Sequence, residues 1–221
     1  QVTGGGSGVG IAALINGSTD IANSSRPIKP AELEKIKAKF GKNAIQIPCA
    51  KDGLSVFLNK GNKVSELTIA QIGGIFSGKI TNWKQVGGDD AKIQLYGRES
   101  SSGTFEFFKE HVVQTDFAAT CQTLPGTAAI INAVKKDKYS IGYGGAAYAE
   151  GVKDCKVKKD ANSKGYLPTE VNIKNKKYPI ARYLYMYLTS KPTGETKKFI
   201  DWILSSEGQK IIAGVGYFPV K

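Results

Sequence analysis

Apolar residues recur at two different spacings along this chain, and the two spacings predict alternating helices and strands. Residues 30–40 show the helical spacing, since Leu33, Ile36 and Phe40 fall on one face and Gly41 ends the run. Short apolar or β-branched runs bounded by turn residues predict strands instead. The expected helices cover residues 11–15, 30–40, 68–76, 126–134 and 196–212, and the expected strands cover residues 19–23, 44–48, 54–58, 93–96, 140–143 and 183–188.

This alternation of strands with helices favours an α/β protein in which helices cover the sheets. The polar, lysine-rich stretch 154–177 is expected to be a loop with short strands, and residues 48–52 and 176–179 are the expected crossings between two lobes. The last helix is expected to bury its apolar residues Phe199, Trp202, Ile203 and Ile211. A chain of 221 residues can bury a sizeable core, and no run of it has the length of a membrane span.

A hydroxyl-rich segment at residues 97–104 lies between one predicted strand and a helical-looking run that begins at Phe105. Ser and Thr at a helix start cap backbone N–H groups, and those N–H groups together with the helix dipole attract anions. Arg98, at the entrance, adds a forked and permanently charged donor that suits a tetrahedral oxyanion. Taken alone, the segment fits an ordinary helix cap followed by a surface arginine equally well.

A glycine-rich segment at residues 3–10 repeats this pattern, because it too leads into a short apolar run. It is not the phosphate loop of nucleotide hydrolases, since no Lys-Ser or Lys-Thr follows the glycines. It also lacks the strand and the acidic residue that a dinucleotide site requires. Two such loops with one arginine indicate a small anion held by neutral donors.

The chain is strongly basic, with 31 Lys and Arg against 19 Asp and Glu and a net charge of +12. Such a charge is compatible with nucleic-acid binding. The lysines are spread along the chain, however, and no RNA-binding or helix-turn-helix signature accompanies them. We therefore expect a solvated basic surface that raises the local concentration of anions, and no nucleic-acid partner.

Cysteine and histidine usage argues against metal and catalytic centres. Cys49, Cys121 and Cys155 lie far apart without metal-ligand spacing, and His111 is the only histidine. No general base accompanies the serines, so a serine or phosphate-ester hydrolase is disfavoured. We expect no enzyme activity, no cofactor and no metal. In an oxidising compartment Cys121 and Cys155 are candidates for a disulfide, which would leave Cys49 free and buried.

Six short motifs are distributed over the whole chain: residues 6–10, 19–27, 76–83, 98–104, 141–143 and 206–209. In this order they resemble the substrate-binding proteins of ABC-type phosphate transporters. The resemblance implies an α/β, two-lobed periplasmic-binding-protein fold of type II, with mixed sheets flanked by helices. It places residues 1–50 and 178–221 in lobe I and residues 51–177 in lobe II.

The resemblance also implies a site for inorganic phosphate with donors from both lobes. From lobe I, Ser7 donates its hydroxyl and Gly8 a backbone N–H. From lobe II, Arg98 is the charged clamp. The remaining implied contacts are Ser25, Ser100, Ser102, Gly103 and Thr104.

Two of these positions depart from the family pattern. Ser25 stands where many members carry an aspartate that accepts the phosphate proton, and Ser100 stands where relatives often have an aspartate that orients the arginine. A serine still accepts a hydrogen bond from protonated phosphate, but losing both carboxylates weakens the expected discrimination against sulfate. Arg26 has two interpretations, a compensating second cation or a salt bridge on the lobe surface.

The start of the chain differs as well, because family members begin with a strand, a Ser/Thr-rich turn and a helix before the segment that opens this sequence. We expect lobe I to show an uncovered apolar face and an open strand edge. Our hypothesis is that a separate peptide or a neighbouring subunit fills this place.

The function implied is extracytoplasmic capture of phosphate, by hinge closure of the lobes, for delivery to the membrane permease of an ABC transporter. The expected location is periplasmic or extracellular, with membrane anchoring through a segment outside this chain left open. The alternative is an extracellular assembly or adhesion protein that reuses the fold, with its N-terminal unit supplied by another chain.

Overall fold

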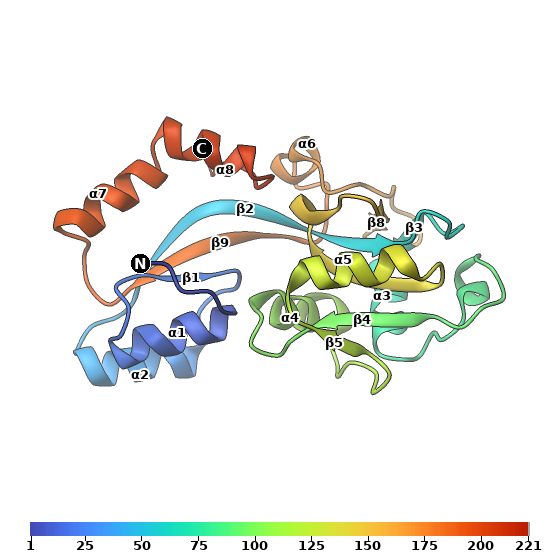
Figure 1. The fold of residues 1–221 in the computed structure, drawn as a ribbon, viewed down its shortest axis with the longest axis horizontal. Helices are drawn as coiled ribbons and strands as arrows, with labels where there is room; N and C mark the ends of the chain where they lie inside the picture. Colours follow the sequence, from blue (N-terminus) through green and yellow to red (C-terminus); the bar gives the residue numbers. More distant parts are fainter. Residues whose placement is uncertain (221) are drawn as a thin grey trace. The chain divides into compact units, whose positions relative to one another are not determined.

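The computed structural model describes residues 1–220, which form two compact units (Figure 1). The first unit contains residues 1–52, 101–103 and the chain from residue 182 onward. The second unit contains residues 53–100 and 104–181. The short segment Ser101–Gly103 therefore belongs to the first unit, although the residues on either side of it belong to the second.

The helices and strands alternate as the sequence pattern predicts. The helices are α1 (Ser7–Asn16), α2 (Pro30–Phe40), α3 (Ile69–Phe76), α4 (Gly103–Phe108), which continues as a π-helix over Lys109–Val113, α5 (Gly126–Lys136), α6 (Glu170–Lys174), α7 (Gly194–Ile203) and α8 (Ser206–Gly214). The strands are β1 (Ala22–Ser24), β2 (Ile45–Leu58), β3 (Glu66–Thr68), β4 (Gln94–Arg98), β5 (Gln122–Leu124), β6 (Ser140–Gly145), β7 (Lys153–Asp154), β8 (Lys156–Lys158) and β9 (Ala181–Leu188).

The main sheet has the strand order β1-β9-β2-β6-β4-β5, and β7 pairs with β2. Strand β4 is parallel to both β5 and β6, whereas β1/β9, β2/β6 and β2/β7 are antiparallel. Strands β3 and β8 form a separate parallel pair. The predicted α/β class, with mixed sheets flanked by helices, is confirmed.

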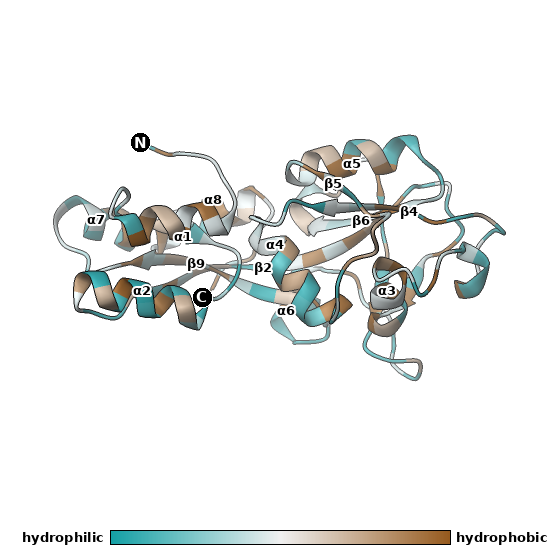
Figure 2. Cartoon of the chain, turned by 90° about the horizontal axis from the view of Figure 1, so that it is seen from below, coloured by the Kyte–Doolittle hydropathy of each residue, from teal (hydrophilic) through white to brown (hydrophobic). Residues whose placement is uncertain are grey.

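In the first unit, alternate residues of β9 face two different cores. Tyr187 packs with Ile11 of α1 and Ile36 of α2, and its neighbour Met186 packs with Ile200 of α7. Figure 1 accordingly shows α1 and α2 on one side of β9 and α7 and α8 on the other. Hydrophobic and hydrophilic bands alternate along α2 (Figure 2), and Ile36 is its fully buried position.

In the second unit, α5 packs on Phe57 of β2 through Ile130 and Val134. A different cluster is aromatic, in which Phe108 stacks on Tyr143 with 3.9 Å between ring centroids. The strand that carries Tyr143, β6, is buried along its whole length. This packing fixes the β4–β6 pair, whose strand β4 ends at Arg98.

The predicted strands at residues 44–48 and 54–58 are one strand, β2, which runs through Pro48. Beyond Pro48, Lys51 exchanges two backbone hydrogen bonds with Phe218, of 2.7 and 2.9 Å. After Gly53 the strand pairs with β6. The predicted break was wrong because pairing partners distant in sequence outweigh the local strand breakers.

The predicted helix at residues 196–212 is two helices, because α7 ends at Ile203 and α8 starts at Ser206. The Ser205 hydroxyl accepts the N–H of Gly208 and caps the second helix. The expected burial of this region was also wrong. Ile200 is the buried residue, at 3% exposure, whereas Phe199, Trp202 and Ile211 are 48%, 41% and 50% exposed.

Two smaller expectations also need correction. The stretch 154–177 contains the short helix α6 in addition to strands. Cys49, Cys121 and Cys155 are free thiols, so the candidate pair Cys121 and Cys155 is not bonded in this structure, and Cys49 is only partly buried. No helix among residues 1–220 is both long enough and apolar enough to cross a membrane.

Candidate functional site

The hydroxyl group of Ser7 organises the predicted donors of the first unit. Ser7 is the first residue of α1 and is 6% exposed. Its Oγ accepts the backbone N–H of Ser25 at 3.0 Å and lies 3.3 Å from the Ser25 hydroxyl. The structure therefore brings Ser7 and Ser25 together, although 18 residues separate them in sequence.

The segment Ser101–Gly103 packs directly against this pair. A Cβ atom on Gly103 would lie 2.2 Å from the Ser7 hydroxyl oxygen and 2.8 Å from that of Ser25, so only glycine fits. The N–H of Gly8 donates to the Ser101 carbonyl at 3.1 Å. Gly8 and Gly103 are thus beside the two serines, and the Gly8 amide already has a protein acceptor.

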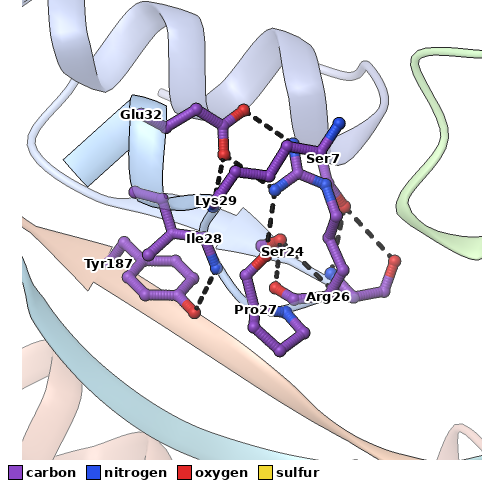
Figure 3. A network of polar contacts seen from close by, with 9 residues as sticks. Ser7, Ser24, Arg26, Pro27, Ile28, Lys29, Glu32 and Tyr187 are labelled. Atoms are coloured by element: carbon purple, nitrogen blue, oxygen red, sulfur yellow. Dashed lines mark hydrogen bonds and ion pairs between the residues drawn. The ribbon is translucent and has the colours of Figure 1, made fainter. Parts of the chain in front are cut away.

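Arg26 follows Ser25. Of the two interpretations of this residue, a second cation for the anion or a salt bridge, the structure supports the salt bridge. Both terminal nitrogens of its guanidinium reach the Glu32 carboxylate at 2.8 Å, and Nη1 also donates to the Pro27 carbonyl (Figure 3). Arg26 is only 4% exposed. Burial alone would raise the pKa of Glu32, but the hydrogen bonds from Arg26 and the Lys29 backbone, together with the charges of both residues, lower it. This arrangement holds the β1–α2 connection rather than presenting a second free cation.

A second buried ion pair in the first unit escaped the sequence analysis. Arg182 of β9 donates to Asp52 of β2 at 2.9 and 3.2 Å, and its Nη1 donates to the Gly103 carbonyl at 3.2 Å. Burial raises the pKa of Asp52, and the guanidinium charge opposes that increase. No local pattern marks these residues, because their pairing depends on two strands 130 residues apart.

In the second unit, Arg98 at the end of β4 is held by two side chains. Its Nε and Nη2 donate to the two carboxylate oxygens of Glu99 at 2.9 and 2.8 Å, and its Nη1 donates to the Thr127 hydroxyl at 3.0 Å. Such a bidentate pair fixes the plane of the guanidinium. Glu99 and Thr127 are functional candidates that the sequence analysis missed, although Glu99 stood beside the predicted clamp.

The supports of Arg98 are themselves held in place. The N–H of Gly126, at the start of α5, donates to Glu99 at 3.3 Å, and the Arg98 N–H donates to the Tyr143 hydroxyl at 3.3 Å. Hydrogen bonds from Arg98 outweigh burial and lower the pKa of Glu99, so Glu99 is an anion at neutral pH. Burial raises the pKa of Tyr143, which keeps its hydroxyl neutral.

The remaining predicted residues differ in exposure. Ser100 is exposed, whereas Ser102 and Thr104 are 2% and 6% exposed. The acid beside Arg98 is Glu99, one residue before Ser100, the position at which relatives often have an aspartate.

The chemistry available here is hydrogen bonding and charge. The first unit offers the hydroxyls of Ser7 and Ser25, and the second unit offers the oriented guanidinium of Arg98. Each kind of donor is suited to an oxyanion. Within residues 1–220, no group of three or more His, Cys, Asp or Glu side chains is arranged to hold a metal ion.

Comparison with known proteins decides the family. Residues 1–207 match the model of the PBP superfamily domain. Over its whole length the chain is 32% identical to the phosphate-binding protein PstS of Pseudomonas aeruginosa and covers 74% of it. Over 92% of its length it is 38% identical to PstS of Staphylococcus epidermidis and covers 65% of that protein. The chain belongs to the PstS phosphate-binding protein family.

Solved structures of this PstS family agree with the architecture. A phosphate ABC transporter substrate-binding protein of Clostridium perfringens, solved with bound phosphate, superimposes with a TM-score of 0.86 at 34% identity. The alignment covers 98% of this chain and 85% of that one. A phosphate transport receptor of Vibrio cholerae gives a TM-score of 0.80 at 31% identity, with 99% and 87% covered. The predicted type II periplasmic-binding fold is confirmed.

The alternative function and the proposed partner chain find no such support among these PstS relatives. None of them points to an assembly or adhesion role, or to a partner chain that completes a missing N-terminal unit. The lobe boundaries and the individual site residues stay predictions.

Proposed function

We propose that this chain binds inorganic phosphate outside the cytoplasm and delivers it to the permease of an ABC transporter, without catalysing a reaction. Its relatives are named as phosphate-binding proteins, and one was solved with phosphate bound. The proposed contacts are Ser7, Gly8, Ser25, Arg98, Ser100, Ser102, Gly103 and Thr104.

The observation that carries this proposal is the way in which Arg98 is held. A guanidinium has five N–H groups, and the bonds to Glu99 and Thr127 use three of them. The two others, one on each terminal nitrogen, remain available to an anion. The side chain is 14% exposed, so it lies at the surface of its unit and is largely desolvated. A cation held in this way binds an oxyanion without first losing side-chain entropy.

Phosphate titration of an Arg98→Ala variant by isothermal calorimetry tests the proposal. Losing two charge-assisted hydrogen bonds is expected to weaken phosphate binding by at least about 100-fold. Arg98→Lys keeps the charge but not the fork and is expected to fall between the wild type and Arg98→Ala.

The matched control is Lys79→Ala, which removes one exposed positive charge from the same unit. It is expected to keep the wild-type affinity. Thermal unfolding of each variant separates loss of binding from loss of fold. Unchanged phosphate affinity in a folded Arg98→Ala protein would refute the assignment.

A further inference from the structure

The excess positive charge of the second unit is concentrated in residues 151–177. This segment has eight lysines and three acidic residues, whereas the rest of the unit has ten Lys and Arg against nine acidic residues. The contacts that we propose for phosphate include none of these lysines. They are therefore a separate feature of the molecule.

The fold gathers several of these lysines around one turn. In β8, Val157 is buried while Lys156 and Lys158 face the other way, as alternation along a strand requires. Gly165 lies against that face, because a Cβ added to it would be 2.8 Å from Glu66 Oε2, 3.1 Å from Lys156 Cβ and 3.3 Å from Lys158 Cγ. The adjacent Tyr166 forms a β-bridge with Val157.

The turn after α6 reaches the same place from a later part of the chain. The ammonium group of Lys177 lies over the ring of Tyr166, 6.0 Å from its centroid. Since Lys164 precedes Gly165, the backbone brings Lys156, Lys164 and Lys177 to one neighbourhood. Figure 1 shows β8 beside β3, with which it forms a parallel pair, and β8 in turn bridges to Tyr166.

Most of these charges are not neutralised by the protein. Among residues 1–220, the exposed lysines that form no ion pair in this segment are Lys156, Lys159, Lys164, Lys176 and Lys177. We call these five residues the β8 lysine surface. Lys158 is 3.9 Å from Glu66 and is not counted among them.

Two of the three acidic residues of the segment are engaged elsewhere, and the third, Asp160, lies beside Lys159. Asp154 accepts the hydroxyl of the buried Ser55, Glu170 pairs with Lys174, and Asp160 accepts the N–H of Asn162. Glu66, which lies opposite Lys156 in β3 and 3.9 Å from Lys158, also belongs to this face. One carboxylate does not balance the lysines around it, so the β8 lysine surface presents a net positive field to solvent.

We propose that the β8 lysine surface binds a linear polymer of phosphate groups. Lysine is a mobile point charge that binds phosphate without requiring a fixed geometry, and here no arginine fork demands a structured partner. A flexible chain of closely spaced phosphates satisfies several such charges at once and releases its condensed counterions. A linear polyphosphate and a poly(glycerol phosphate) chain share this chemistry.

The surface lacks the features of other anionic partners. Single-stranded nucleic acid is held by open aromatic faces on which bases stack, but Lys177 covers the face of Tyr166. Insertion into a membrane interface requires a long amphipathic helix, whereas α6 has only five residues. A polymer without bases fits the β8 lysine surface best.

Fluorescence anisotropy with labelled polyphosphate and labelled poly(glycerol phosphate), over a series of salt concentrations, tests this proposal. The variant is the triple substitution Lys156→Gln, Lys164→Gln and Lys177→Gln. We expect it to lose at least about tenfold in affinity at low salt, and to flatten the slope of log affinity against log salt by roughly two. The polymer that binds the wild type more tightly identifies the source of the phosphate chain.

The matched control is Lys35→Gln, Lys37→Gln and Lys42→Gln, which removes the same charge from exposed positions of the first unit. It is expected to keep both the affinity and the salt slope. Calorimetry with inorganic phosphate should give wild-type values for both variants, which separates this surface from the site proposed at Arg98.

Three results would overturn the proposal. The first is that neither phosphate polymer binds the wild type, and the second is that the control loses as much affinity as the triple variant. The third is tighter binding of single-stranded DNA or of phosphatidylglycerol vesicles than of both phosphate polymers.

Discussion

Arg98 is positioned by its neighbours before any ligand arrives. Glu99 holds one edge of the guanidinium and Thr127 holds one terminal nitrogen. The carboxylate orients the group but also offsets its charge, so the phosphate that we propose here would meet a nearly neutral pair with two directed N–H donors. This arrangement favours selection by hydrogen-bond geometry over selection by charge.

Thr127 offers a direct test of this positioning role. Thr127→Val keeps the side-chain volume but removes the acceptor for Arg98 Nη1, so the guanidinium loses one of its two supports. We expect phosphate affinity to fall by about fivefold, corresponding to about 1 kcal/mol, as calorimetry would measure.

Thr127→Ser is the control, since it retains the hydroxyl and is expected to bind phosphate as the wild type does. An affinity of Thr127→Val equal to that of Thr127→Ser would show that Thr127 does not position the arginine.

At the scale of elements, Ser205 separates the two C-terminal helices, although the apolar spacing of the sequence predicts one continuous helix. The N–H of Leu204 still donates to Ile200, which closes α7, and the Ser205 hydroxyl then accepts the Gly208 N–H to begin α8. The Cβ of any larger residue at 208 would lie 2.3 Å from the Trp202 carbonyl oxygen. The bend therefore needs both the cap and the glycine.

Ser205→Ala is expected to lower the free energy of unfolding by about 1 kcal/mol, because α8 loses its N-terminal cap. Urea unfolding followed by circular dichroism measures the change. Ser205→Asp, which keeps an acceptor at the cap, should recover most of the loss. Equal stability of the alanine variant and the wild type would mean that the Ser205 cap does not stabilise the start of α8.

At the scale of the whole molecule, the three thiols report on global unfolding. Burial raises the pKa of Cys49 and of Cys121 to about 11 and that of Cys155 to about 12. Since the thiolate is the reactive form, the native protein should react with iodoacetamide at pH 8 at least about tenfold more slowly than the unfolded protein.

Mass spectrometry then counts the modified thiols. In guanidinium chloride without reductant, three modified cysteines per chain are expected. A single modified cysteine would instead reveal a disulfide between the other two and contradict the free thiols of this structure.

Several elements could be predicted from the sequence because their signals are local. Helix α2 has the expected bounds, with Pro30 in its first turn and Gly41 at its C-terminal cap. Strands β6 and β9 also lie where apolar runs predicted them. Of the candidate site, the sequence indicated the hydroxyl-rich loops and the arginine, because these residue types are themselves the chemistry.

What the sequence alone determined is therefore the class of fold and the family, through short motifs and regular spacings. Tertiary structure decided the partners: Glu99 and Thr127 on Arg98, Asp52 on Arg182, and a continuous β2 through Pro48. The physical reason is that each of these depends on residues brought together by strand pairing and core packing. Such contacts leave no periodic trace in the local sequence.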